Sequence, residues 1–369
     1  MLTYILPFLV LILVVVFIHE YGHYYFAKRF GVGVTDFSIG FGPEIFGWND
    51  KSGTRWKICV IPLGGYVKFF GDRNVYSQTD QEKILKQYDK EDQNKLFVLK
   101  PLYQRALIVV GGPLANFLLA IFIFFSVYTF AGKDFTPAVI NEVQKDSPAM
   151  IAGLKTSDII ISIDGNKVKS IMEVSKFIMM STDEFIDFTI KRSSQNLILR
   201  VKPNMVDGED DFGNKITKRM VGIKLGAYNN EINHVKLGPA RALFYAANEV
   251  YFVSISSLKY MGSIITGSGD SSQLGGPIRI AKISGQVAEF GILPFISMMA
   301  YISISLGLIN LFPIPMLDGG HLMFYGIEKV LGRPLSQKVQ EGFFRIGMFL
   351  LLSLMFFTTF NDLKDLGLF

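Results

Sequence analysis

The sequence contains little of several residue types that mark other classes of protein. Its 369 residues include one cysteine, Cys59, and four histidines, and only 19% are charged. A single cysteine excludes an internal disulfide, and Cys59 fits a small apolar position in the strand-like run 58–61. The formal net charge is only +5, with acids and bases interspersed, so the chain shows no nucleic-acid-binding footprint.

The amino-terminal segment lacks the marks of a cleaved secretory signal. No basic residue precedes the apolar run that begins at Leu2, and no small-residue cleavage site follows it. We therefore expect a retained helix. Half of the residues are hydrophobic and the mean hydropathy is +0.33, which is too apolar for an ordinary soluble enzyme of this length. The chain is expected to be embedded in a membrane.

A metal-ligand motif, His19-Glu20-Tyr21-Gly22-His23, stands at the end of this first apolar run. On a helix, His19 and His23 lie about 40° apart on one face and can direct both imidazoles at one ion. Neutral imidazoles suit zinc, and Glu20 beside them can serve as the general base for a zinc-bound water. The alternative is a polar helix end that binds nothing. The motif favours hydrolysis of a peptide bond within the bilayer.

A third zinc ligand is expected in the run 310–321, which reads NLFPIPMLDGGH. Catalytic zinc usually takes three protein ligands, and Asp318 brings an acid to the membrane level of the two histidines. The alternative is that Asp318 caps the next helix. His321 is either a further ligand or, as we favour, a supporting neighbour of the site. Asn310 is expected to hydrogen-bond the substrate carbonyl or its developing oxyanion, or else to make a helix–helix contact.

Four apolar segments are long enough to cross a bilayer as helices of about 20 residues. They are 2 to about 27, 106–130, about 292–312 and 343–360. Basic residues follow the first segment and precede the second, so the connection between them is expected to be cytoplasmic and the amino terminus outside. If a fifth segment, 243–266, also crossed the membrane, Asp318 would lie on the opposite side of the membrane from His19 and His23. We expect this fifth segment to be an amphipathic helix on the outer surface or a short buried helix of the soluble domain.

Several runs of the sequence resemble the bacterial site-2 proteases of the RseP type, which are zinc intramembrane proteases. In the family order, they are HEYGH, FSIGFGP at 37–43, GGYVKF at 64–69, GGPLAN at 111–116, GGPIRIA at 275–281 and the run 310–321. The resemblance implies that His19, His23 and Asp318 bind Zn²⁺. It also implies general acid–base catalysis by Glu20 and substrate or transition-state contacts by Asn310. It gives Asn116 no role beyond packing or polar support. The implied substrates are single-span membrane proteins, of the anti-sigma factor or remnant signal peptide type.

The region 136–203 resembles a PDZ domain. Its signature is Ser147-Pro148-Ala149, then Ala152-Gly153-Leu154, then the run 158–165. The β-branched run 159–163 predicts a strand closed by a turn at Asp164-Gly165, and 171–180 has helical spacing. One such domain is detectable, where the best-known family members carry two. Residues 207–218, rich in glycine and charge, predict a linker or exposed loop.

The cytoplasmic segment predicts a β-hairpin. Residues 37–46 and 55–69 are apolar, glycine-punctuated runs separated by 48–54, consistent with a hairpin that dips toward the site. An exposed strand edge can hold an unwound substrate by β-augmentation. The alternative is a simple surface hairpin. Residues 73–100 predict a solvated connection, and His234 is expected to be a solvated loop histidine.

The sequence therefore predicts a polytopic α-helical membrane protein with a cytoplasmic, membrane-associated β-hairpin region and an inserted extracytoplasmic PDZ domain of the α+β type. The predicted domains are 1–132 (membrane region with the HExxH helix), 133–205 (PDZ domain), 206–290 (linker and amphipathic helix) and 291–369 (membrane region with the LDGG motif). We expect a zinc endopeptidase of the bacterial inner membrane. Its expected partners are single-span substrates and membrane lipid, with the PDZ domain contacting the substrate ectodomain or trimmed C-terminus. A proteolytically silent scaffold and a metal transporter are the alternatives.

Overall fold

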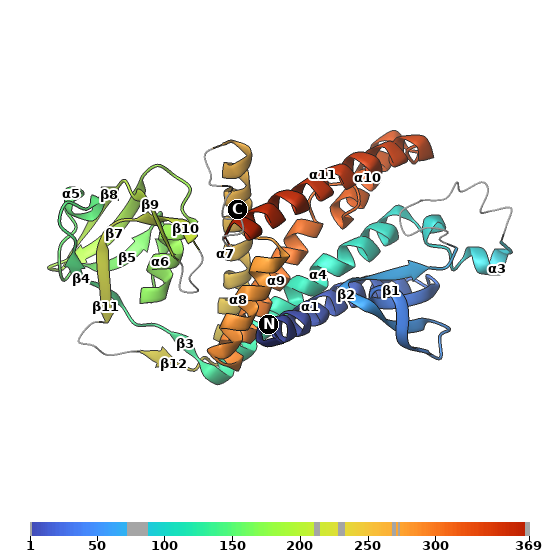
Figure 1. Ribbon diagram of the computed structural model, residues 1–369, viewed down its shortest axis with the longest axis horizontal. Coiled ribbons are helices and arrows are strands. Elements are labelled where there is room, and N and C mark those ends of the chain that lie inside the picture. Colours follow the sequence, from blue (N-terminus) through green and yellow to red (C-terminus); the bar gives the residue numbers. More distant parts are fainter. Residues whose placement is uncertain are drawn as a thin grey trace. The chain divides into compact units, whose positions relative to one another are not determined.

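The computed structural model describes residues 2–71, 88–209, 215–227, 233–267, 271 and 274–365. It divides into two compact units, one of residues 1–123 with 276–362 and one of residues 124–275 with 363–369. Each unit is described by itself (Figure 1). Much of the predicted connection at 73–100, and residues 228–232 just before His234, lie outside the described residues.

Helices dominate the first unit. They are α1 (Leu2–Arg29), the short α3 (Lys90–Gln93), most of α4 (Leu102–Ser126), α8 (Pro277–Glu289), α9 (Ile292–Asn310), α10 (Asp318–Leu331) and most of α11 (Gln337–Asp365), with a 3₁₀ turn at Phe97–Leu99. A π-helical turn, Val127–Ala131, continues α4. Figure 1 shows α1 and α4 running alongside each other.

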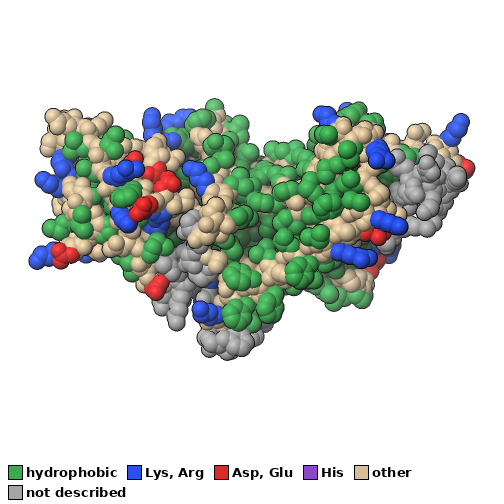
Figure 2. All heavy atoms as spheres, turned by 90° about the horizontal axis from the view of Figure 1, so that it is seen from above, with side chains coloured by type: hydrophobic (Ala, Val, Ile, Leu, Met, Phe, Trp, Pro, Cys, Tyr) green, Lys and Arg blue, Asp and Glu red, His purple; other side chains and the backbone are tan. Residues whose placement is uncertain are grey.

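Four helices are long and apolar enough to cross a membrane, as the sequence predicts. They are Thr3–Arg29, Leu102–Ala131, Ile292–Asn310 and Gln337–Lys364. Only 6% of the most apolar window of α11 is buried, so its apolar side chains face outward. Figure 2 shows hydrophobic side chains gathered over this helix. An exposed apolar area of this kind is stable in contact with lipid rather than water.

The predicted hairpin is present as β1 (Val34–Asn49) and β2 (Arg55–Phe69), which pair antiparallel. Residues 55–58 of β2 pair with two different segments of β1. Segment 44–49 pairs with 55–59, and segment 34–39 pairs with 65–69 as well as with 55–58. Segment 34–39 therefore lies inside the sheet, and 65–69 forms one of its edges. The predicted runs are confirmed, although β1 begins earlier than 37 and ends later than 46.

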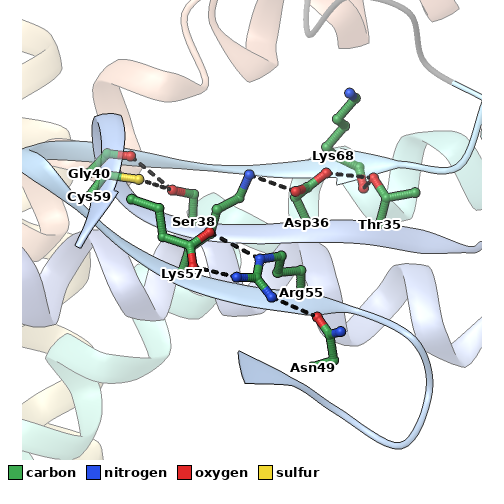
Figure 3. Close-up of polar contacts among 10 residues, drawn as sticks. Thr35, Asp36, Ser38, Gly40, Asn49, Arg55, Lys57, Cys59 and Lys68 are labelled. Atoms are coloured by element: carbon green, nitrogen blue, oxygen red, sulfur yellow. Dashed lines mark hydrogen bonds and ion pairs between the residues drawn. The ribbon is translucent and has the colours of Figure 1, made fainter. Parts of the chain in front are cut away.

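Polar side chains join these segments (Figure 3). Arg55 donates to both carboxylate oxygens of Glu44, and the Lys57 ammonium lies 2.6 Å from Asp36. Cys59 is buried with its Sγ 3.3 Å from the Ser38 hydroxyl, which confirms the small buried position expected for it.

The second unit contains an antiparallel sheet with short helices. Its strand order is β11-β4-β5-β7-β8, with β6 paired to β5. The elements are β4 (Ala138–Val143), α5 (Pro148–Ile151), β5 (Ile159–Ile163), β6 (Asn166–Lys167), α6 (Ile171–Met180), β7 (Ile186–Arg192), β8 (Gln195–Val201) and β11 (Ile223–Ala227). The predicted strand 159–163, its Asp164-Gly165 turn and the predicted helix 171–180 are confirmed.

Alternating burial explains the core of this sheet. Ile186, Phe188 and Ile190 are fully buried while the residues between them are more exposed, which is the period of two expected for a strand with one covered face. Val174 and Ile178, four residues apart on α6, are buried against the same core. The side chains of this core therefore come from both the sheet and the helix.

The prediction of a linker or exposed loop at 207–218 was wrong for residues 207–209 and 215–218, and residues 210–214 lie outside the described residues. Strands β9 (Asn204–Glu209) and β10 (Lys215–Met220) pair antiparallel with Met205 opposite Arg219. The glycines and charged residues of 207–218 dominated the local sequence pattern, so the strand-forming residues were missed. The sheet also continues beyond residue 205, because β11 pairs with β4.

Two elements complete the second unit. Strands β3 (Lys133–Asp134) and β12 (His234–Val235) pair antiparallel, so the two ends of the inserted region meet. His234 is exposed as expected, but it lies in a strand rather than a loop. The predicted helix at 243–266 is present as α7 (Pro239–Ile265), and within the described residues it is not among the candidate spans.

Candidate active site

Three side chains of the first unit converge on one point. His19 Nε2 and His23 Nε2 lie 3.3 Å apart, and Asp318 Oδ2 lies 3.2 Å from the first and 3.5 Å from the second. Two atoms bound to one tetrahedral zinc at about 2.0–2.1 Å lie about 3.3 Å from each other. The three separations match that value. No other group of metal-binding side chains occurs among the residues that the structure describes.

The hydrogen bonding of His23 prepares it to bind a cation. Its Nδ1 lies 2.9 Å from the carbonyl oxygen of Ile108. Because a carbonyl only accepts hydrogen bonds, Nδ1 carries a hydrogen, and in the neutral imidazole Nε2 then presents a lone pair. The facing oxygen of Asp318 is buried and accepts no hydrogen bond. Lone pairs that meet in a buried space repel unless a cation lies among them, so the donor set fits zinc.

A bend in the chain brings Asp318 to the histidines. Pro313 and Pro315 interrupt the helical pattern after α9, and Met316 has a φ of 94°, which is uncommon for a residue with a side chain. Leu317 is the N-cap of α10, and no side-chain hydrogen bond caps that helix. Asp318 is the first residue of α10 and does not occupy its N-cap position, which disfavours the alternative that it caps the helix.

Two glycines allow this bend to pack closely. A Cβ atom on Gly319 would lie 2.2 Å from the carbonyl oxygen of Phe312, and one on Gly320 would lie 2.5 Å from that of Ile314. Either side chain would force the loop away from α10. The two glycines that follow Asp318 are thus needed to hold the loop against the helix that begins with it.

The charge of Asp318 follows from its surroundings. Burial raises the pKa of its carboxyl, and positive charge beside it, on protonated imidazoles or on a zinc ion bound among them, lowers the pKa below its ordinary value. With zinc bound to neutral imidazoles, Asp318 is a carboxylate at neutral pH, as a zinc ligand must be.

Helix α4 forms one wall of the site through three residues spaced by four. Ile108 accepts from His23, and the Asn116 amide lies 3.2 Å from His19 Nδ1. Between them, a Cβ atom on Gly112 would lie 2.3 Å from His23 Nε2 and 2.8 Å from His19 Cε1. Only glycine leaves room for both imidazoles there.

Glu20 lies beside the three candidate ligands. Its carboxylate is close enough to His19, His23 and Asp318 to interact with each electrostatically. Strand β2 packs against its stem, since a Cβ atom on Gly65 would lie 3.0 Å from Glu20 Cγ. The hairpin therefore contacts the residue expected to act as the base.

The other predicted residues lie outside the converging group. Asn310 is the last residue of α9 and is half-buried, and no described hydrogen bond joins its side chain to Glu20 or to the candidate ligands. The His321 ring packs against Phe344 and Phe324, with centroid separations of 5.7 and 6.5 Å. His321 is not part of the converging group, which favours the supporting role over ligation.

The hairpin is fastened to α1 one turn beyond Glu20. Asp50 accepts hydrogen bonds from the Tyr24 hydroxyl and the Trp56 indole, both at 3.1 Å. Burial raises the pKa of Asp50, but hydrogen bonds from Ser52, Trp56 and Thr54 hold it well below its ordinary value. The carboxylate is therefore charged at neutral pH and binds the turn of the hairpin to the helix that carries His19 and Glu20.

Comparison with known proteins identifies the family. The profile of peptidase family M50 matches residues 7–354. The chain belongs to peptidase family M50. This M50 protein is a zinc-dependent metalloendopeptidase and a multi-pass membrane protein. The resemblance to site-2 proteases is thereby confirmed, as are zinc as the cofactor and peptide-bond hydrolysis as the reaction.

Relatives match the M50 chain along nearly its whole length. "Putative zinc metalloprotease Atu1380" of Agrobacterium fabrum is 41% identical over 363 residues, covering 98% of this chain and 96% of the relative. Metalloprotease MmpA of Caulobacter vibrioides is 33% identical over 377 residues, covering 96% and 94%. Among solved structures, the PDZ domain of an SdrC-like protein from Listeria monocytogenes is 25% identical, with a TM-score of 0.20, and covers 25% of this chain and 88% of that one.

Sequence reasoning missed the contributions of Ile108 and Gly112 and left the role of Asn116 open. A backbone carbonyl carries no sequence signal at all. The run GGPLAN did mark Gly112 and Asn116, but their contacts with His23 and His19 depend on how α1 packs against α4.

Proposed function

We propose that this M50 protein is an intramembrane endopeptidase that performs regulated intramembrane proteolysis of single-span membrane proteins. The observation that carries the proposal is the place of the converging side chains. His19 and His23 lie within the candidate span Thr3–Arg29, and Asp318 follows the span Ile292–Asn310 by eight residues. A cluster carried by one candidate span and by the start of α10, shortly after another span, is suited to a peptide bond inside the bilayer.

In this proposal, His19, His23 and Asp318 hold the zinc. When bound, zinc polarises the scissile carbonyl and makes a water more acidic. Glu20 accepts a proton from the attacking water, whose oxygen bonds to the carbonyl carbon, and then delivers that proton to the amine as the C–N bond breaks. Asn310 donates a hydrogen bond to the carbonyl oxygen as it gains negative charge.

The hairpin is proposed to hold the substrate in extended form. A transmembrane helix hides its peptide carbonyls, so cleavage requires local unwinding. Segment 65–69 is a sheet edge among the described strands, and Gly65 within it contacts Glu20. A substrate strand added at that edge would lie beside the catalytic carboxylate. The exposed apolar side chains of the hairpin, which suit a membrane-associated position, are Phe41, Ile45, Phe46, Ile58, Val60 and Ile61.

The proposed orientation follows from the basic residues at the ends of the spans. The amino terminus and the PDZ region lie outside the bacterial inner membrane, and the hairpin and the active site lie toward the cytoplasm. The apolar side chains exposed along α7 suit a position at the outer membrane surface; they include Leu243, Phe244, Tyr251, Ile255 and Leu258. The PDZ region contacts the substrate ectodomain or its trimmed C-terminus. The substrates are of the anti-sigma factor or remnant signal peptide type.

Cleavage in a defined membrane tests the proposed reaction. The purified protein is reconstituted in vesicles with a single-span substrate, and the products are mapped by mass spectrometry. We expect cleavage inside the apolar segment, toward its cytoplasmic end. A matched substrate whose apolar segment consists of leucine should be cleaved more slowly, because it resists unwinding. Cleavage confined to segments outside the membrane would rule out the proposal.

Cysteine labelling tests the orientation. Single cysteines are introduced at the exposed positions Lys236, Thr266, Lys51 and Arg333 after Cys59 is replaced by serine. A membrane-impermeant thiol reagent applied outside should label the first two, on either side of α7, and spare the last two. If residue 266 reacts only from the cytoplasm while residue 236 reacts from outside, α7 spans the membrane and the orientation is wrong.

A further inference from the structure

Asn116 lies at the crossing of three helices. It is fully buried on α4, with its amide 3.2 Å from His19 of α1, and its backbone carbonyl accepts a 2.9 Å hydrogen bond from Ser303 of α9. Its own Oδ1 is buried without a hydrogen-bond partner. A buried polar atom left unpaired costs about 1–3 kcal/mol, so its presence calls for an explanation.

The proposed role of His19 determines which hydrogen bond it makes. Its Nε2 faces Asp318 and His23, so that atom must present its lone pair to bind zinc. A neutral imidazole then carries its hydrogen on Nδ1, which can only donate. The partner of Nδ1 must therefore be an acceptor, and an amide nitrogen is not one.

A half-turn of the Asn116 amide resolves the mismatch with His19 Nδ1 and gives the amide oxygen a partner. It exchanges Oδ1 and Nδ2, which have nearly the same shape and are assigned by their hydrogen bonds. The unpaired oxygen then accepts from His19 Nδ1. The result repeats the arrangement at His23, whose Nδ1 donates to the carbonyl of Ile108 on the same helix.

We propose that Asn116 is a positioning residue for the zinc site, whose amide oxygen accepts the Nδ1 hydrogen of His19 and so fixes the tautomer and direction of that ligand. Helix α4 thereby orients both imidazoles, one through a backbone carbonyl and the other through a side chain. This inference rests on the proposed role of His19 as a ligand. Groups that orient a ligating histidine typically contribute about 10- to 100-fold to metal affinity.

Two substitutions separate an acceptor from a space-filling residue. Asn116→Leu keeps the branched shape and the number of side-chain heavy atoms, with a larger volume, and removes the acceptor, and Asn116→Asp supplies an oxygen in either orientation. The measurement is zinc bound per chain in the purified full-length protein, titrated with a chelator. We expect Asn116→Leu to lower zinc affinity about 10- to 100-fold and Asn116→Asp to retain zinc at least as well as the unaltered protein. If the amide nitrogen were the partner of His19, Asn116→Asp would lose zinc instead.

Two controls distinguish the ways the inference can fail. Ser303→Ala removes a hydrogen bond to the Asn116 backbone without touching the amide, so zinc affinity should stay within about 2-fold of the unaltered protein. His19→Ala should lose zinc outright. If it does and Asn116→Leu retains zinc normally, the positioning role is wrong while the proposed site stands. If His19→Ala also retains zinc, the proposed site itself is wrong. Equal zinc loss in Ser303→Ala and Asn116→Leu would show a packing role and overturn the inference.

Discussion

The two units differ in how their buried carboxylates are hydrogen-bonded. In the second unit, Asp158 is 1% exposed and accepts two 2.7 Å hydrogen bonds from Arg192, as well as one from the Lys155 backbone. In the first unit, Asp318 directs a buried oxygen at two imidazoles and accepts no hydrogen bond there. A fully paired acid stabilises a fold, whereas an acid and two imidazoles that converge without hydrogens between them form a site that needs a cation.

The comparison extends to the neighbours of these acids. In the second unit, Glu173 pairs with Lys133 at 2.9 Å, and Glu249 of α7 pairs with Lys176 of α6. In the first unit, the electrostatic neighbours of Glu20 include two imidazoles and another acid, with no lysine or arginine among them. An acid that no lysine or arginine holds in an ion pair is available for proton transfer, which is the role proposed for Glu20.

The largest effect is expected at Glu20. Glu20→Gln removes the base without removing a proposed ligand, so zinc should stay bound while turnover falls by roughly 10²–10⁴-fold or more. Zinc stoichiometry and cleavage of a single-span substrate are measured on the same preparation. Full zinc content with undiminished turnover would show that Glu20 is not the base.

Removal of the inserted region should change selectivity rather than chemistry. The pairing of β3 with β12 brings its ends together, so residues 138–227 can be replaced by a short glycine-serine linker. Zinc binding should persist, because every proposed ligand lies in the first unit. We expect intact, untrimmed substrates to be cleaved about as fast as trimmed ones if the region filters substrates. Loss of cleavage of both, with zinc retained, would favour delivery of substrate by this region.

A smaller effect, on stability alone, is expected at Asp158, whose carboxylate is already paired. Asp158→Asn breaks the buried pair with Arg192 and should lower the stability of the second unit by about 3 kcal/mol. Proteolysis of this unit across a denaturant series measures the loss. Zinc affinity should not change. Loss of zinc along with stability in this variant would contradict the distinction between Asp158 as a structural acid and Asp318 as a zinc ligand.

The comparison predicts the smallest effect at Lys176. Its ion pair with Glu249 is partly exposed, with side-chain exposures of 23% and 12%. Lys176→Ala should therefore cost less than about 1 kcal/mol, by the same proteolysis assay. A loss as large as that of Asp158→Asn would mean that the contact between α6 and α7 matters more than its exposure indicates.

Much of the first unit was predictable because its signals are local. His19, Glu20 and His23 follow one helical spacing, and the four spans are long apolar runs. Asp318 was identifiable because an acid beside two prolines at the end of a span is rare and costly. The role of Asn116 depends on which helix packs against α1, and no local sequence pattern predicts that contact.

The second unit shows where local signals fail. Strand β5 and helix α6 were predicted at their observed bounds because each carries a clear period. The β9–β10 hairpin and β11 were missed, since the glycine and charge between 207 and 218 dominated the pattern. The pairing of β11 with β4 joins residues about 85 positions apart and depends on tertiary contact.

The central claim is that two histidines and an acid from separate helices share one zinc ion. Zinc K-edge absorption of the purified protein and of Asp318→Ala tests it most directly. For the unaltered protein, we expect two imidazole nitrogens and oxygen ligands at about 2.0–2.1 Å, with no sulfur. Asp318→Ala should lose most of its zinc. Full zinc content in Asp318→Ala with an unchanged spectrum would contradict the account.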